Sequence, residues 1–146
     1  MARQNQTTGV VYVKSWSGDV DIAGGSNGQQ VRFRTLTELL TIAAAASSTT
    51  TIQIPADARV MGVSVRVTTV IPTAATFDVG VSGATTRYGT GIAVAAGTTN
   101  DGTGDTALRY YSAAAAIVIT PNLQPADATG RVRVTIHFYE ITPPTS

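Results

Sequence analysis

The chain has 146 residues, which is enough for one domain with a real hydrophobic core. Ten basic and nine acidic residues give a formal net charge of +1, so neither nucleic acid nor a membrane surface is expected as a partner. Cysteine is absent, which excludes disulfides, thiolate metal sites and cysteine nucleophiles, and no apolar run is long enough to cross a bilayer.

The first 30 residues differ in kind from the rest. They are rich in Gln, Gly and Ser, and they contain a single Trp16 and one short apolar stretch formed by Val10, Val11, Tyr12 and Val13. A segment of this composition cannot bury enough apolar surface to fold alone. It is either a loose terminus or an arm that orders by adding a strand to a neighbouring subunit, and the β-propensity of the apolar stretch favours the arm. The expected organisation is an N-terminal arm, 1–30, and one β domain, 31–146.

From residue 31 onward, apolar and polar residues alternate with a period of two, which indicates strands with one buried and one solvent-exposed face. The expected strands, in chain order, are 31–35, 50–54, 63–70, 77–81 and 131–141, with shorter ones at 10–14, 91–96, 107–112 and 116–120. Residues 36–46 contain helix-forming Leu and Ala, but the Thr and Ser residues around them favour strand or irregular structure. Turn residues recur about every ten positions, which predicts an antiparallel sandwich or barrel.

The charged fraction is low, 13% where about 25% is typical of a soluble domain. Thr, Ala and Gly take the place of the missing charges. Surfaces of this kind are common in proteins that pack against copies of themselves, so we expect self-assembly. A secreted domain that is simply rich in Thr is the alternative.

The sequence contains few candidate catalytic residues. His137 is the only histidine, and it lies on the polar face of an expected strand beside Arg133 and Tyr139, where a solvated or interface residue is the simplest interpretation. No nucleophile elbow, zinc-protease motif or phosphate-binding loop occurs. Scattered carboxylates could still meet in space as a glycosidase pair, although Asp57, Asp101, Asp105 and Asp127 stand in turns. We expect no enzyme, no catalytic residue and no cofactor.

The segment 100–105, NDGTGD, offers oxygen ligands at alternating positions, an arrangement that a Ca²⁺ ion can use. It lacks the glutamate that closes an EF-hand loop. No metal site is therefore predicted, and the question whether this loop takes an ion stays open.

Residues 54–72 read IPADARVMGVSVRVTTVIP, and with 75–80 (ATFDVG), 87–93, 117–122 and 130–139 they resemble a module of tailed-bacteriophage virion proteins. The resemblance covers about 49–141. It implies a jelly-roll-like antiparallel β-sandwich that forms trimers, either as a cement or decoration protein on a capsid or at the end of a head or tail fibre. The implied structural positions are Gly62 where a strand bends or is closely approached, Phe77 and Val79 in the core, and Gly80 at a turn.

No repetitive shaft precedes the module in this chain, which favours a capsid cement protein over a fibre. The resemblance then implies an all-β homotrimer on the outer surface of the virion, with the phage major capsid protein as partner and an extended N-terminal arm. The candidate contact residues are Val10, Val11, Tyr12, Val13 and Trp16 in the arm, and Arg32, Arg34, Arg131 and Arg133 on strand faces. The alternative is a receptor-binding or fibre-tip adhesion module, with Tyr88, Tyr110 and Tyr111 beside the loops 82–88 and 98–105.

Overall fold

The computed structural model describes residues 12–14, 19–102 and 108–146, and for residues 12–14 and 19–23 it describes the backbone only. The described residues contain strands and connecting turns, and no helix among them could span a membrane. The strands are β1 (Tyr12–Lys14), β2 (Asp19–Gly24), β3 (Gln30–Thr41), β4 (Ser48–Ile54), β5 (Arg59–Thr69), β6 (Thr76–Val81), β7 (Ala84–Ala93), β8 (Thr99–Asn100), β9 (Arg109–Tyr110), β10 (Ala115–Pro121) and β11 (Arg131–Thr142).

The strands form two antiparallel sheets. The first has the order β1-β2-β3-β11-β5-β8, with β9 also paired to β5, and the second has the order β4-β10-β6-β7. Because β8 and β9 pair with two successive parts of β5, they act as one interrupted edge strand. From β3 onward the chain therefore makes eight strands, of which the first, eighth, third and sixth lie in one sheet and the second, seventh, fourth and fifth in the other. This is the strand order of a jelly roll, and the expected fold class is confirmed.

The core lies between the two sheets. In β11 the alternating residues Val132, Val134, Ile136 and Phe138 are fully buried, as their period of two predicts. Phe77 and Val79 of β6 face them from the second sheet and are also fully buried, which confirms their expected core positions. Burial of each such side chain contributes about 1.5–3 kcal/mol. Among the described residues, all buried hydrophobic side chains lie at position 40 or later.

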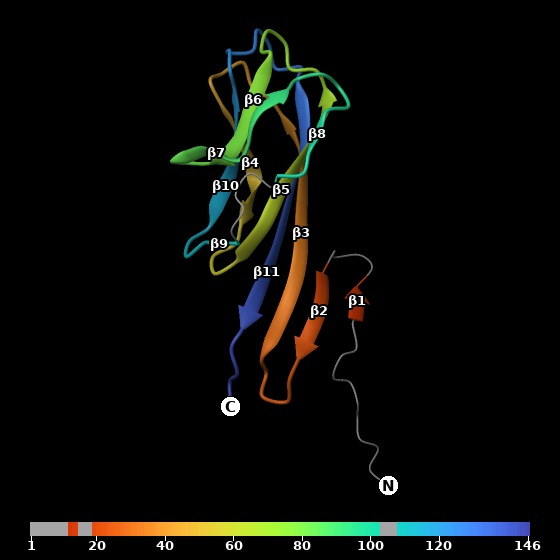
Figure 1. Cartoon of the computed structure of the whole chain (residues 1–146), viewed down its shortest axis with the longest axis vertical. Helices are drawn as coiled ribbons and strands as arrows, with labels where there is room; N and C mark the ends of the chain where they lie inside the picture. Colours follow the sequence, from red (N-terminus) through yellow and green to blue (C-terminus); the bar gives the residue numbers. More distant parts are fainter. Residues whose placement is uncertain (1–11, 15–18, 103–107) are drawn as a thin grey trace.

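The first sheet is longer than the second. Figure 1 shows β3 and β11 continuing beyond the sandwich toward the C-terminus, with β2 alongside. There β2 pairs with residues 30–33 of β3, which pair in turn with residues 139–142 of β11. We call this three-stranded extension the blade. No strand of the second sheet pairs with it or is drawn over it, so the blade projects from the end of the sandwich.

Two strands of the first sheet lie in the segment that the sequence assigns to an arm. β1 pairs with β2, and β2 pairs with β3 of the same chain, so part of residues 1–30 belongs to the sheet of this protomer. The strand β2 was not expected from the sequence. The division into an arm, 1–30, and a domain, 31–146, stays a prediction.

Two glycines show where the resemblance was right and where it was wrong. The register with β11 shifts beside Gly62, which fits the expected bend of the strand, but a Cβ there would lie 3.4 Å from the carbonyl oxygen of Gly102, an ordinary van der Waals contact. Gly80 does not stand at a turn. It lies inside β6, and the turn follows at Ser82 and Gly83. A Cβ on Gly80 would overlap the backbone of Ala84 and Thr85, so the glycine allows the hairpin strands to approach.

Candidate functional site

The arginines expected as contacts lie on two opposite faces of the first sheet. Arg34 pairs in register with Phe138 and Arg32 with Glu140, so both arginines share the face that carries the core, but they lie beyond the sandwich, on or beside the blade. Arg131 and Arg133 are exposed on the outer face of the same sheet. The four residues therefore do not form one patch.

Arg34 has a structural role of its own. Its Nη1 lies 3.5 Å from Oε2 of Glu140, and its guanidinium lies 5.9 Å from the centre of the Phe138 ring. The Arg34 side chain thus covers the Phe138 ring at the end of the core, while its guanidinium stays partly exposed to water. An ion pair this exposed contributes at most about 1 kcal/mol.

The outer face carries a basic cluster that sequence reasoning missed in part. Arg133 of β11 pairs in register with Arg66 of β5, so their side chains leave the same face side by side. Arg131 lies two residues from Arg133, and all three arginines are exposed. We call these three residues the arginine triad. Arg66 stands at a polar position of an expected strand, but only the register between β5 and β11 reveals its partner.

A shallow groove of about 290 Å³ runs beside the triad. It is lined by Arg66 and Arg133, and by the polar side chains of Ser64, Thr99, Asn100, Asp101 and Thr135, with Val65. Within the part of the chain that the structure describes, no member of the triad makes a salt bridge.

His137 and Ser64 lie next to this groove and contact each other. The hydroxyl of Ser64 is 2.8 Å from Nε2 of His137, across neighbouring strands. A serine–histidine pair becomes a catalytic unit when a carboxylate orients the ring and donors stabilise an oxyanion. Among the side chains described in 24–102 and 108–146, no carboxylate hydrogen-bonds to His137. The contact between Ser64 and His137 links two neighbouring strands, β5 and β11.

His137 is expected to make stability depend on pH. Burial lowers the pKa of its imidazole below the ordinary value of 6.5, so the unfolded chain binds this proton at a higher pH than the folded protein does. The free energy of unfolding should therefore fall as the pH drops through about 6.5. In urea titrations at several pH values, His137→Gln should flatten this part of the profile and Ser64→Ala should retain it. If the free energy of unfolding depended on pH in the same way for His137→Gln and the parent chain, His137 would not be the group responsible.

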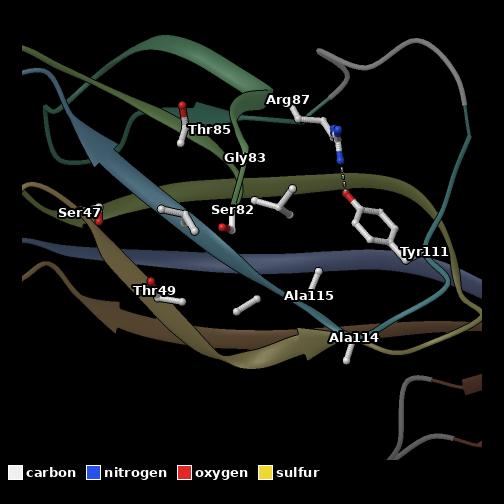
Figure 2. A pocket seen from close by; sticks show the side chains of 12 residues that line it. Ser47, Thr49, Ser82, Gly83, Thr85, Arg87, Tyr111, Ala114 and Ala115 are labelled. Carbon is white, nitrogen blue, oxygen red and sulfur yellow. Dashed lines mark hydrogen bonds between the residues drawn. The ribbon is translucent and has the colours of Figure 1, made fainter.

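The second sheet carries a larger hollow of about 650 Å³. Small side chains line most of it, and Figure 2 shows Arg87 pointing toward Tyr111 at one end. The guanidinium donates to the Tyr111 hydroxyl at 3.1 Å, and that hydroxyl is 2.7 Å from the hydroxyl of Tyr88. This hydrogen-bonded chain ties β7 to the segment just after β9.

These contacts remove two of the three tyrosines suggested for adhesion. Tyr88 is 2% exposed and Tyr111 is 8% exposed, so neither ring can stack on a sugar. Tyr110 is 49% exposed, but its hydroxyl donates to Asp57 and Arg59 lies over its ring. Burial of Tyr88 was not visible in the sequence, because the edge strand β7 has no clear alternation around it.

Asp127 behaves as its turn context predicts, whereas Asp57 accepts from the hydroxyl of Tyr110. Asp127 accepts hydrogen bonds from the backbone and hydroxyl of Thr129, which lower its pKa. In the described part of the segment 100–105, Asn100 accepts from the amide of Gly102 at 2.8 Å. Residues 103–107, including Asp105, lie outside the described residues. Among those described, no three acidic or histidine side chains gather in a way that could hold a metal ion.

The expected arm contacts fall partly outside the described residues. Tyr12 and Val13 belong to β1, at the free edge of the first sheet, where they pair with Asp21 and Val20. Val10, Val11 and Trp16 lie outside the described residues. A contact role for any of the five stays a prediction.

No protein-family model matches this chain, and no curated protein matches it. Among solved structures, the chain is similar to a chain of the cyanophage Pam1 capsid asymmetric unit. The two are 22% identical, the match covers 95% of this chain and 97% of that chain, and the TM-score is 0.49. At this identity, the function has to be inferred from the residues of this chain itself.

Proposed function

We propose that this chain is a structural, non-catalytic protein of a phage virion. In the proposed role it is a cement or decoration protein that binds the outer surface of the assembled head, as a homotrimer, and stabilises junctions between capsomers of the major capsid protein. The observation that carries the proposal is the jelly-roll strand order, which is built largely from the residues of the phage-like module. Phe77 and Val79 of the module take the core positions that the resemblance implies, whereas Gly80 lies inside β6 and not at a turn.

The surface of the first sheet supports an interface role. Its outer face combines the partly exposed side chains of Leu39 and Ile141 with the Phe33 and Tyr139 rings, whose centres are 5.4 Å apart. Among the described elements none covers this face, and apolar and aromatic side chains grouped on an uncovered sheet face are typical of a contact surface. The low charge of the chain supports the same conclusion.

The proposed mechanism is stabilisation by mass action. A protein that binds the closed shell and not its separated subunits stabilises the shell, because the shell cannot open without losing its contacts with that protein. A trimer suits such a role because capsid lattices offer three-fold junctions between capsomers. This role needs no proton transfer, nucleophile or metal.

Particles that lack this protein test the proposal. They should assemble with normal geometry but release their DNA at a lower temperature or after osmotic shock. Adding the purified protein back should restore heat resistance in a saturable way, because binding stabilises as the logarithm of the free concentration. Heat release and adsorption to host cells would be measured on the same particles.

The alternative function, a receptor-binding or fibre-tip adhesion module, gives the opposite pattern. Depleted particles would then release DNA at the same temperature as complete particles but fail to adsorb to cells. That result would reject the cement role.

A further inference from the structure

The arginine triad places three positive charges close together, and no salt bridge among the described residues neutralises them, although Asp101 lines the same groove. Arg133 and Arg66 are directly opposite each other in the register of β11 and β5, and like charges at such positions destabilise a sheet. Arg131 adds a third guanidinium two residues along the same face. The hydroxyl of Thr68 donates to the carbonyl of Arg131 and so holds its backbone without neutralising its charge.

The other carboxylates whose side chains the structure describes, in 24–102 and 108–146, have local partners. Glu38 accepts from the backbone of Thr51 and Ile52, Asp57 accepts from Tyr110, Asp78 accepts from Thr90 and Gly91, Asp127 accepts from Thr129, and Glu140 pairs with Arg34. Asp101 lines the groove and has an interaction of its own. The described surface of a second copy therefore offers few carboxylates that are not already engaged, so an acidic segment of a different protein is the better match for the triad.

The groove offers guanidinium, hydroxyl and amide groups that can hydrogen-bond to carboxylates, and Asp101 is the one carboxylate among the described residues of its lining. Two neighbouring guanidinium groups can each bind a carboxylate through two parallel hydrogen bonds. Ser64, Thr99, Asn100 and Thr135 line the same 290 Å³ groove and can bind the peptide groups beside such carboxylates. A nucleic acid fits less well, because the net charge of the chain is only +1 and no aromatic side chain lines the groove on which a base could stack.

We propose that the arginine triad and its groove form a docking site for an acidic peptide segment of the partner protein, with Asp or Glu side chains between Arg66 and Arg133. The inference rests on the proposed function, since it names the chemistry by which the chain attaches to a protein shell. The partner's carboxylates would relieve the repulsion between the arginines. Removing the arginine charges should therefore weaken attachment to the partner but leave the isolated chain as stable as before or more stable.

The double variant Arg66→Gln/Arg133→Gln tests the site, with Arg87→Gln as a control that removes a charge from β7 in the second sheet. Binding to purified shells that lack the protein would be measured over a range of NaCl concentrations, together with the melting temperature of each free variant. The double variant should bind about tenfold more weakly, with a flatter salt dependence, and should melt at or above the temperature of the parent chain. Arg87→Gln should bind as the parent does.

A direct probe separates this inference from the proposed function. Hexaglutamate peptide added to the isotopically labelled protein should shift the NMR signals of Arg66, Arg131 and Arg133, and a single-stranded DNA hexamer should shift them less. Parent-like shell binding by the double variant would overturn the docking site while the cement function stands. Failure of the parent chain to bind shells would reject the cement function, and the peptide shifts would still test the site. Stronger shifts with DNA than with hexaglutamate would overturn the assignment to carboxylates.

Discussion

Replacing Gly102 with alanine is expected to lower the free energy of unfolding by about 2–4 kcal/mol. Gly102 has a φ of 73°, a left-handed conformation that costs an alanine about 1–2 kcal/mol. A Cβ at this position would also overlap the backbone of Val63 in β5. Because the obstacle is backbone rather than a flexible side chain, either β5 shifts or the short strand β8 separates from it.

Gly83→Ala is the matched control. Gly83 has a φ of 80°, but a Cβ there meets nothing within 4 Å, so only the backbone strain of about 1 kcal/mol is expected. Urea unfolding of both variants would measure the difference, and hydrogen exchange would show whether the amides of β8 lose protection in Gly102→Ala. Equal losses for the two variants would mean that the close approach of Gly102 to β5 has no energetic consequence.

The same close approach shows what sequence patterns can predict. The alternation from Val132 to Phe138 predicts both the strand and its buried face, because a side-chain period of two is a local property of the chain. Residues 36–41 continue β3, which is one of the two outcomes, strand or irregular structure, expected for 36–46. The turn at Asp127 is likewise local, since Asp127 and Thr129 are two residues apart.

Features that depend on the partner strand could not be predicted in this way. The pairing of Arg133 with Arg66 joins residues far apart in the sequence, and a shift of one residue in register would place them on opposite faces. The sequence places Tyr88 at the end of an expected loop and Tyr111 in a short strand beside another, as candidates for exposed contacts, yet their hydroxyls hydrogen-bond to each other inside the molecule. The strand β2 contains two Asp and two Gly or Ala residues and forms by pairing with β3 rather than through its own propensity.

The blade and the outer face belong to one continuous surface. Tyr139 and Ile141 of the blade lie on the same face of β11 as Arg131 and Arg133, because all four are separated by even numbers of residues. This surface therefore changes along β11 from a basic end to an apolar end. A partner that covers this surface can place carboxylates at the triad and apolar side chains over the blade. Because the two ends of β11 differ in this way, the partner would bind in one direction along the strand.

Deletion of residues 1–25 is expected to separate attachment from folding. It removes β1 and β2, but the buried hydrophobic side chains of the described chain lie at position 40 or later and stay in place. The free energy of unfolding should fall by no more than about 1–2 kcal/mol, since a strand at the edge of a sheet adds little apolar burial. Attachment to shells should fall by about a hundredfold or more, because the deletion takes away the expected contacts at Val10, Val11, Tyr12, Val13 and Trp16 together with one strand of the blade.

Point variants in β2 distinguish loss of the strand from loss of the arm. Val20 pairs with Val13 on one side and Phe33 on the other, so Val20→Pro removes a donor from a strand with two neighbours, whereas Val20→Thr keeps its β-propensity. If the arm attaches through its paired form, Val20→Pro should bind shells as weakly as the deletion and Val20→Thr should bind as the parent does. Cosedimentation with shells measures attachment, and urea unfolding checks that each variant is folded. Undiminished attachment of the chain without residues 1–25 would rule out the arm as an attachment element and leave the outer face of the first sheet as the contact surface.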